Sequence, residues 1–251
     1  MNLSVSTWNY LCAYAHEAKL REAIREAVAD GFGVELWLAW IAEPDALNET
    51  HWQEIRQMLE GARVSLHTAL GRWDEEAFNN ELDMVASLGA RVLVVHESTV
   101  GLKPDSGTVQ TDSYRKAVEC ARSKGVQIAL ENGTSAGLLA ALNTTDEIEI
   151  CLDIGHANLS DEGVQHFLDT FGNKIGHVHL SDNYGQTDDH LVPGDGYIAM
   201  NDWRNLLKTL QGANFSGTMV FELNTTEPRR NAKRGREFIQ YVARSIEADS
   251  R

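Results

Sequence analysis

Three observations on the sequence predict a single (β/α)8 TIM barrel. Strand-like and helix-like segments alternate along the whole chain. The length of 251 residues matches the usual size of one such barrel, so residues 1–251 are expected to form one domain. Six strand-like segments end in a histidine or a carboxylate, and parallel β/α units bring the C-terminal ends of their strands to the same side.

Eight short apolar runs are the predicted strands. In chain order they are Leu3–Thr7, Gly33–Leu38, Val64–Thr68, Arg91–His96, Gln127–Glu131, Glu149–Asp153, Ile175–Leu180 and Thr218–Glu222. No Pro-rich or Ser-rich linker interrupts the series, which favours one closed barrel over two domains. A doubly wound sheet is the alternative, but the first strand lacks the GxGxxG turn of a dinucleotide-binding fold.

A helical segment with apolar residues at helical spacing follows each predicted strand. These segments are centred on Leu20–Val28, Trp52–Leu59, Phe78–Leu88, Asp112–Lys124, Ala136–Leu142, Val164–Phe171, Trp203–Leu210 and Phe238–Ile246. Glycine follows four of the helical runs, where a left-handed C-cap favours it, at Gly31, Gly89, Gly125 and Gly212.

The formal net charge of −15, from 22 basic and 37 acidic residues, argues against a nucleic-acid partner, whose binding depends on cationic contacts to phosphate. Three widely spaced cysteines without a CxxC pair fit a reduced, cytoplasmic compartment. No secretory signal and no apolar run of about 20 residues is present, so no membrane association is expected. The oligomeric state stays open.

The strand ends carry a set of residues suited to metal binding, namely His67, His96, Glu131, Asp153, His179 and Glu222. Imidazole and carboxylate together suit divalent ions such as Zn²⁺, Mn²⁺ or Co²⁺. Carboxylates that converge on one mouth would repel each other without a cation. Taken singly, His96 could be a core histidine and Glu222 a helix cap, but six such endings in order favour a site.

Two local motifs sharpen this interpretation. In the first, Asp153 ends a strand and His156 follows three residues later, with Gly155 permitting a tight turn. In the second, we expect only one histidine of the pair His177 and His179 to face the barrel interior, and we assign His179 to it.

The segment after this strand adds further candidates. Asp182 follows closely, and Asp188 and His190 precede a loop whose glycines, Gly194 and Gly196, would allow close backbone approach to a ligand. We expect Asp182 to contact the substrate.

The order of these motifs resembles the xylose isomerase-like TIM-barrel superfamily over the whole chain. That superfamily includes sugar phosphate isomerases and epimerases and the endonuclease IV type of DNA repair enzyme. The segment from His177 to Glu222, in which Asp202 and Trp203 open a helix, most resembles the isomerase/epimerase branch.

The resemblance implies a site for each branch. In the epimerase branch, the residues matching Glu131, Asp153, His179 and Glu222 hold one divalent ion (Mn, Zn, Co or Mg). The two matching glutamates exchange substrate protons, and the residue matching His156 contacts substrate hydroxyls.

In the endonuclease branch, a cluster of three zinc ions also uses the positions of His67, His96, His156, Asp188 and His190. All of these positions are suitably filled here, so the ligands do not separate the two branches. Ketose epimerases of the family often carry an arginine six residues after the histidine that matches His179, and this sequence has Gly185 there.

Metal-assisted proton transfer next to the carbonyl of a sugar, sugar phosphate or related polyol is the leading hypothesis, with Glu131 and Glu222 as the catalytic residues. A dehydratase of a ketose-like substrate would share its first step. The alternatives are a zinc-dependent endonuclease acting at abasic sites and a non-catalytic sugar-binding barrel.

Two residues near the expected mouth are also candidates for substrate contact. His67 would present its imidazole, and Trp8 could form an aromatic wall for a sugar ring or simply pack in the core. Glu35 is expected either to form a salt bridge or to point into the barrel behind the site. The basic cluster between Arg229 and Arg236 is either a phosphate site or a solvated face.

Overall fold

Eight parallel strands close into a barrel in the computed structural model, which describes residues 1–14, 20–38, 49–103, 108–109 and 111–249. Each barrel strand pairs with two neighbours, in the order β1-β10-β9-β8-β7-β4-β3-β2. The strands are β1 (Leu3–Ser6), β2 (Gly33–Trp37), β3 (Val64–His67), β4 (Val92–Val95), β7 (Gln127–Glu131), β8 (Glu149–Asp153), β9 (Ile175–Leu180) and β10 (Thr218–Phe221). The predicted (β/α)8 TIM barrel is confirmed, with all eight strands close to their expected bounds.

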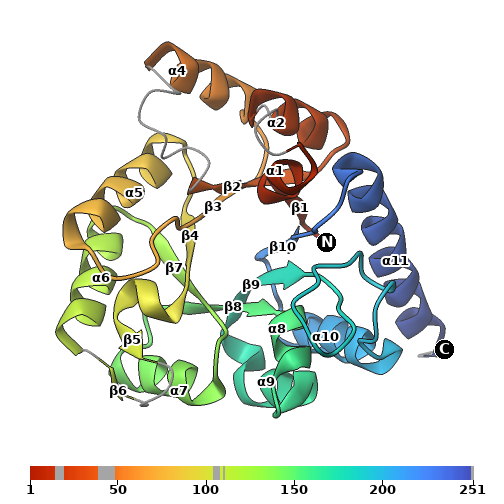
Figure 1. Cartoon of the computed structure of the whole chain (residues 1–251). Helices are drawn as coiled ribbons and strands as arrows, with labels where there is room; N and C mark the ends of the chain where they lie inside the picture. The colour runs from red at the N-terminus through yellow and green to blue at the C-terminus, as the bar shows by residue number, and fades with distance from the viewer. Residues whose placement is uncertain (15–19, 39–48, 104–107, 110, 250–251) are drawn as a thin grey trace.

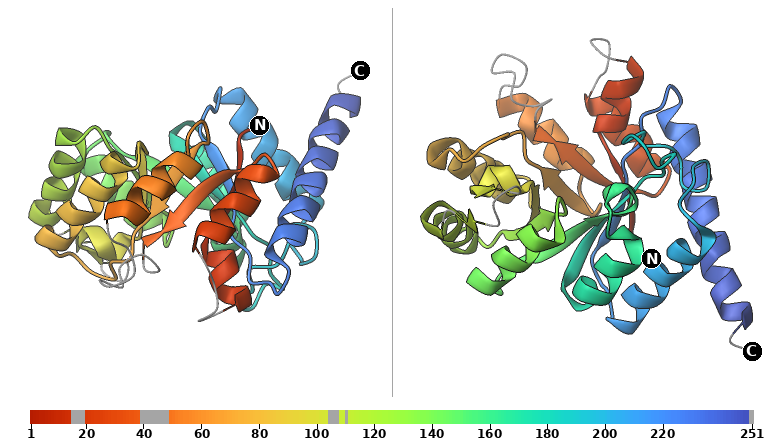
Figure 2. Two further views of the ribbon diagram at one scale, coloured as in Figure 1. Left: turned by 90° about the horizontal axis from the view of Figure 1, so that it is seen from above. Right: turned by 60° about the horizontal axis from the view of Figure 1, so that its bottom comes forward.

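Helices form a ring outside the strands (Figures 1 and 2). They are α2 (Leu20–Ala29), α4 (Glu49–Met58), α5 (Glu75–Ser87), α6 (Thr111–Ser123), α7 (Ser135–Thr144), α9 (Gly163–Phe171), α10 (Met200–Gly212) and α11 (Pro228–Asp249). The strand residues that face outward pack on this ring because successive side chains of a strand point to opposite sides. Ile150 and Leu152 of β8, for example, are buried in the main apolar core together with Phe167 of α9 and Trp203 of α10.

Polar side chains occupy much of the barrel interior. A small apolar cluster of Val94, Ala129 and Cys151 lies apart from the main core. Glu35, at 0% exposure, and His179, also at 0%, are buried and bonded to each other. Branched aliphatic residues usually fill this space in such barrels. A polar interior of this kind must satisfy its own hydrogen bonds.

Short elements that the sequence did not predict lie between the predicted strands and helices. They are α1 (Trp8–Tyr14), the 3₁₀ helix η2 (Glu97–Val100), the antiparallel pair β5 (Leu102–Lys103) and β6 (Thr108–Val109), α8 (Ile154–Leu159), and the 3₁₀ helix η4 (Gly172–Lys174). Each is too brief to show an apolar repeat.

Helix α8 replaces the tight turn expected at Gly155. Asp153 caps it, because its Oδ1 accepts a hydrogen bond from the His156 backbone N–H at 3.0 Å. Glycine is needed at position 155 because there is no space for a side chain: a Cβ atom there would collide with Ser181 Oγ. The motif therefore starts a helix.

Three of the four predicted glycine caps adopt the left-handed conformation, with φ of 76° at Gly31, 71° at Gly89 and 67° at Gly125. The fourth prediction is wrong. Gly212 is the last residue of α10, and Asn214 takes the left-handed conformation instead, with φ of 54°. Asparagine tolerates this region better than most residues.

The first and last β/α units are joined by ion pairs. Asp30, just after α2, accepts from Arg229 of α11 through Nε at 2.7 Å and Nη2 at 2.9 Å, and lies 3.0 Å from Lys233 Nζ. The Arg236 side chain donates to the Asp30 carbonyl and lies 4.4 Å from the centre of the Phe32 ring. The hydrogen bond from Arg229 is the main cause that lowers the pKa of Asp30 to about 2.

Among the described residues, no helix is both long enough and apolar enough to cross a lipid bilayer.

We expect Asp30→Asn to lower the melting temperature at pH 7 by about 2–4 °C, because it removes the carboxylate that joins α2 to α11. The pKa of Asp30 is lowered from 3.8, so its stabilising effect is full above pH 4 and is lost as the pH falls toward 2. The difference between wild type and variant should shrink over this range. Asp195→Asn, which breaks the more exposed pair with Arg234, is the control and should cost less. Equal melting temperatures of wild type and Asp30→Asn at pH 7 would contradict the prediction.

Candidate active site

Four of the predicted metal ligands meet at the C-terminal end of the barrel. Glu131 ends β7, Asp153 ends β8, His179 lies in β9 and Glu222 directly follows β10. One donor atom from each lies within 4.8 Å of the others, and all four side chains are buried. We call these four residues the central cluster.

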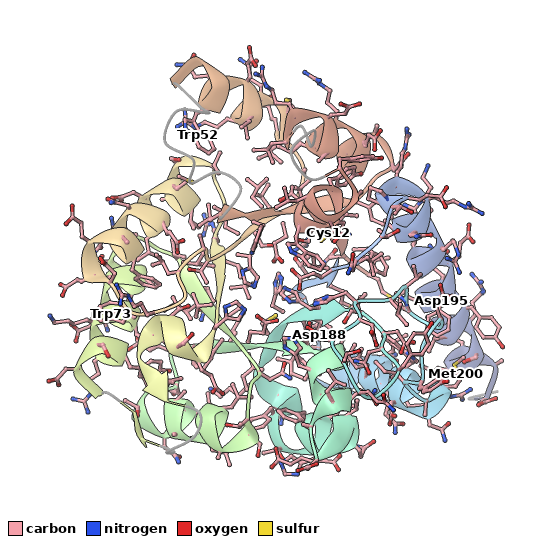
Figure 3. All side chains as sticks on the ribbon, in the orientation of Figure 1. Cys12, Trp52, Trp73, Asp188, Asp195 and Met200 are labelled. Carbon is pink, nitrogen blue, oxygen red and sulfur yellow. The ribbon has the colours of Figure 1, made fainter. Side chains whose placement is uncertain are left out.

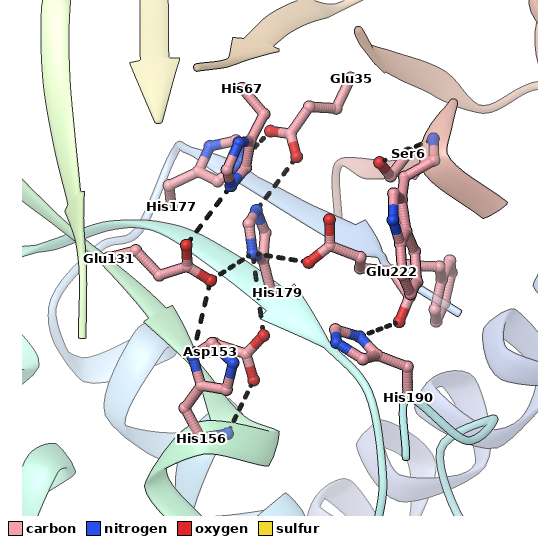
Figure 4. A network of polar contacts seen from close by, with 12 residues as sticks. Ser6, Glu35, His67, Glu131, Asp153, His156, His177, His179, His190 and Glu222 are labelled. Atoms are coloured by element: carbon pink, nitrogen blue, oxygen red, sulfur yellow. Dashed lines mark hydrogen bonds and ion pairs between the residues drawn. The ribbon is translucent and has the colours of Figure 1, made fainter. Parts of the chain in front are cut away.

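His179 occupies the middle of the central cluster (Figure 4). Its Nδ1 lies 3.1 Å from Glu131 Oε1, 3.3 Å from Glu222 Oε2 and 3.8 Å from Asp153 Oδ2. Strand register brings these groups together, because Asp153 pairs with His179 across β8 and β9. Three carboxylates therefore share a single imidazole.

The surroundings shift the pKa values of two carboxylates of the central cluster in opposite directions. Burial opposes the charge of Glu131, but His179 and its hydrogen bonds hold the pKa of Glu131 well below the ordinary value. Burial raises the pKa of Glu222. Within the described residues, Asp153 Oδ2 is buried without a hydrogen-bond partner, a state that is rare in proteins.

The donor atoms of the central cluster fit a divalent cation. One imidazole and three carboxylates suit borderline ions such as Zn²⁺, Mn²⁺ or Co²⁺. A cation would satisfy the unpartnered oxygen of Asp153 and offset the repulsion among the carboxylates.

Two further groups of metal-ligand type adjoin the central cluster. His67 Nε2 and His96 Nε2 lie 3.3 Å and 3.0 Å from Glu131 Oε2. On the other side, His156 Nε2 and His190 Nε2 lie 3.1 Å and 2.8 Å from Asp188 Oδ2. Asp188 is labelled toward the middle of the molecule in Figure 3. The structure thus brings all of the predicted ligand positions into one connected array.

The two remaining substrate-contact candidates differ in their surroundings. The Trp8 ring, half-buried, lies 4.6 Å from the His190 ring, so it belongs to the wall of this array. Asp182 is fully buried, and its carboxylate accepts hydrogen bonds from the backbone N–H groups of Asn183, Gly194 and Ile198. Asp182 does not join the array.

Gly194 and Gly196 allow the backbone of this loop to approach the Asp182 carboxylate rather than a ligand. A Cβ atom at Gly196 would collide with Asp182 Oδ1. The close backbone approach predicted for this loop therefore occurs, but the group approached is the protein's own carboxylate. Asp182 anchors the loop that follows His190.

The expectation that only one of His177 and His179 faces the interior was wrong. Residues two apart in a strand share a face. Both side chains are buried, and the Nε2 atoms of His177 and His179 lie 2.8 Å and 3.0 Å from the carboxylate of Glu35. Both alternatives for Glu35 occur together, because it points into the barrel and its carboxylate pairs there with these histidines. The two-residue alternation of side chains along a strand could have identified His177 as a second residue that faces the interior.

Acidic groups or backbone oxygens of the chain itself engage the basic cluster of α11. Arg229 and Lys233 bind Asp30, Arg230 binds Glu227, Arg234 binds Asp195, and Arg236 donates to the Asp30 carbonyl. In Figure 3, Asp195 is labelled beside α11, away from Asp188. These contacts favour the solvated-face interpretation over a phosphate site.

Gly185 stands where the resemblance to ketose epimerases predicts an arginine. Its φ of 75° is in the left-handed region, where an arginine would be strained. An arginine at this position would therefore need a different local backbone conformation.

Residues 24–242 match the family model described as xylose isomerase-like TIM barrel. The chain belongs to this family. The match covers the barrel from within α2 to within α11, and so includes every residue of the central cluster.

Curated relatives of this family member are distant. It spans about half the length of the first two, including 51% of an uncharacterised protein from Sinorhizobium fredii, to which it is 27% identical over 164 residues (59% of this chain). It is 24% identical over 259 residues to an inosose dehydratase from Lacticaseibacillus casei, with 86% of this chain and 85% of the relative covered.

Solved structures share the fold. A D-tagatose 3-epimerase-like protein superposes with a TM-score of 0.78 at 19% identity over 100% of both chains. The IolI protein with a bound zinc atom superposes with a TM-score of 0.74 at 18% identity, covering 95% of this chain and 98% of that one.

We expect Glu222→Gln to raise the melting temperature of the metal-free protein at pH 8 by about 2–4 °C, because it removes one of three buried like charges. Thermal unfolding after treatment with a chelator measures the effect. Glu237→Gln, on the exposed face of α11, is the control and should leave the melting temperature unchanged. A lower melting temperature for Glu222→Gln would show that the carboxylates do not oppose one another.

Proposed function

We propose that this protein is a divalent-metal-dependent isomerase or epimerase that transfers a proton next to the carbonyl of a sugar, sugar phosphate or related ketose. One observation carries the proposal. Three buried carboxylates and one imidazole converge within 4.8 Å, and one carboxylate oxygen has no partner among the described residues. Such a cluster is suited to a divalent cation, and two of its carboxylates would also move protons.

Glu131, Asp153, His179 and Glu222 are the residues that would hold the metal. When bound, a divalent cation would supply Lewis-acid stabilisation of the negative charge that develops on the substrate oxygen. The zinc-bound structure of the same fold supports a divalent metal in this family of barrels.

Glu131 and Glu222 are the proposed proton-transfer residues. They lie on opposite sides of the His179 ring (Figure 4). One carboxylate would take the proton from the carbon beside the carbonyl, and the electrons of the C–H bond would form the C=C bond of an enediolate. The other would return a proton to the opposite face, which inverts that carbon. Carboxylates can do this work near neutral pH when they are partly desolvated, as both are here.

The residues around the central cluster would hold the substrate. The half-buried His156 presents an imidazole, which can bind hydroxyl groups, and Trp8 offers an aromatic face to the apolar side of a sugar ring. His67 is buried with its ring nitrogens on Glu131 and the Thr68 carbonyl, so it would act on the substrate through Glu131. The net charge of −15 gives no general attraction for anions, which favours a substrate whose recognition does not rest on phosphate.

Dehydration is a variant of the same chemistry. After the first proton is removed, loss of a β-hydroxyl group with a second proton would release water instead of inverting the carbon. Two observations favour this variant: the nearly full-length match to an inosose dehydratase, and Gly185 in place of an epimerase-type arginine.

Proton exchange with solvent tests the proposal for all of these outcomes. The protein, loaded with Mn²⁺, Co²⁺ or Zn²⁺, is incubated in D₂O with D-tagatose, L-ribulose and inosose. We expect deuterium at the carbon beside the carbonyl of at least one substrate, followed by NMR. An inverted carbon identifies an epimerase, an aldose an isomerase, and an unsaturated or diketone product a dehydratase. Absence of exchange for every substrate and metal would count against the proposal.

We expect Glu131→Gln to reduce the exchange rate by about 10²–10⁴-fold, because an amide cannot accept the proton. Removal of metal with a chelator should abolish exchange, and added metal should restore it. Glu227→Gln, which alters an exposed carboxylate bound to Arg230, is the control and should keep the wild-type rate. Wild-type exchange in Glu131→Gln would exclude this role for Glu131.

A zinc-dependent endonuclease is the second candidate, favoured by the two histidine-containing groups beside the central cluster. The net charge and the internally bound α11 cations oppose it. We expect no incision of an abasic duplex at physiological salt by protein loaded with excess Zn²⁺. Clean incision, together with three metal ions per chain by elemental analysis, would reverse the order of the two candidates.

A further inference from the structure

A single carboxylate binds two histidines beneath the central cluster. Glu35 of β2 is fully buried inside the barrel. Its Oε1 lies 3.0 Å from His179 Nε2, and its Oε2 lies 2.8 Å from His177 Nε2 and 2.9 Å from Ser65 Oγ. The partners come from β3 and β9, and the two histidines are 142 and 144 residues from Glu35 in the sequence.

The hydrogen positions follow from the chemistry of the groups. An ionised carboxylate only accepts hydrogen bonds, so both Nε2 atoms must carry a hydrogen. The pairing with two imidazoles is what makes a buried charge at Glu35 tolerable. His179 therefore directs Nε2–H toward Glu35 and turns Nδ1 toward Glu131, Asp153 and Glu222.

His177 and Ser65 fix the orientation of the carboxylate. Both bind Oε2, so the plane of the Glu35 carboxylate is held and Oε1 remains for His179. Among the described residues, His177 hydrogen-bonds to Glu35, and its donor atoms lie within 4.8 Å of those of Cys151 and His179 but form no such group with the carboxylates of the central cluster, so its part in this arrangement is indirect.

We propose that Glu35 is a positioning residue that fixes His179 with its proton on Nε2, so that Nδ1 is free to bind the metal. The inference rests on the proposed function, since it assumes that the central cluster binds a divalent cation. A carboxylate behind a metal-binding histidine sets both the tautomer and the ring orientation. Here the same carboxylate is itself held by a second buried histidine.

Zinc affinity of a Glu35→Gln variant tests the inference. Glutamine keeps the shape but offers one acceptor oxygen to two imidazole donors. We expect its dissociation constant for Zn²⁺, measured by competition with a chromophoric chelator, to rise about 10–100-fold. Glu81→Gln is the matched control, since Glu81 of α5 is half-buried and binds Thr68 and Ala69 but no histidine. Its Zn²⁺ affinity should stay within about twofold of wild type.

A second measurement does not depend on the variant folding. In zinc-loaded wild-type protein with ¹⁵N-labelled histidine, we expect NMR to show a proton on Nε2 of His179 and none on Nδ1. A role in packing alone would not fix this pattern. A His179 Nε2 without a proton, or a folded Glu35→Gln variant with wild-type Zn²⁺ affinity, would overturn the inference.

The binding measurements distinguish a failure of the proposed function from a failure of the role proposed for Glu35. Wild-type protein that binds no divalent cation would contradict the proposed function itself. Tight binding by wild type and equal binding by Glu35→Gln would remove only the positioning role of Glu35.

Discussion

Repulsion among buried carboxylates is the constraint that the surrounding structure has to meet. Glu131, Asp153 and Glu222 share one imidazole, and a cluster of like charges removed from water is costly without compensation. Other groups of the chain hold two of the three carboxylates in place. His67 and His96 contact Glu131, and Asp153 Oδ1 accepts a hydrogen bond from a backbone N–H at the start of α8. Among the described residues, Asp153 Oδ2 is left without a hydrogen-bond partner, which a cation would provide.

The closed barrel makes this arrangement rigid. Because each barrel strand has two neighbours, the strand ends cannot move apart without breaking main-chain hydrogen bonds on both sides. The interior beneath the rim is equally constrained, since Glu35 links strands on different sides of the barrel through His177, His179 and Ser65. On the outside, Asp30 joins the first unit to α11. Barrel closure and these cross-links thus restrict the movement of the strands that hold the like charges of the site close together.

The surface around the site separates the two enzymatic candidates better than the ligands do. Every position that the resemblance to the endonuclease branch implies for three metal ions carries a suitable residue, so the array alone is compatible with sugar chemistry and with phosphodiester hydrolysis. The cations of the basic cluster on α11 are bound within the chain, three of them to Asp30. Under the proposed function, Trp8 beside His190 and the half-buried His156 would offer an aromatic and a hydrogen-bonding surface to a small polar ring.

The barrel and the polar residues at its rim can be predicted from the sequence. Apolar periodicity is a local property, and a polar residue at a strand end is visible in its own segment, so Glu131, Asp153 and His179 could be assigned from neighbouring residues alone.

Contacts between segments that are distant in the sequence became visible only in the folded structure. The bonds of Glu35 to His177 and His179, and those of Arg229 to Asp30, join residues more than 140 positions apart. Such contacts depend on strand register and barrel closure, which no local pattern encodes. Asp182 illustrates the same limit. Its acidic side chain predicted a contact with substrate, but in the folded chain its carboxylate accepts hydrogen bonds from three backbone N–H groups.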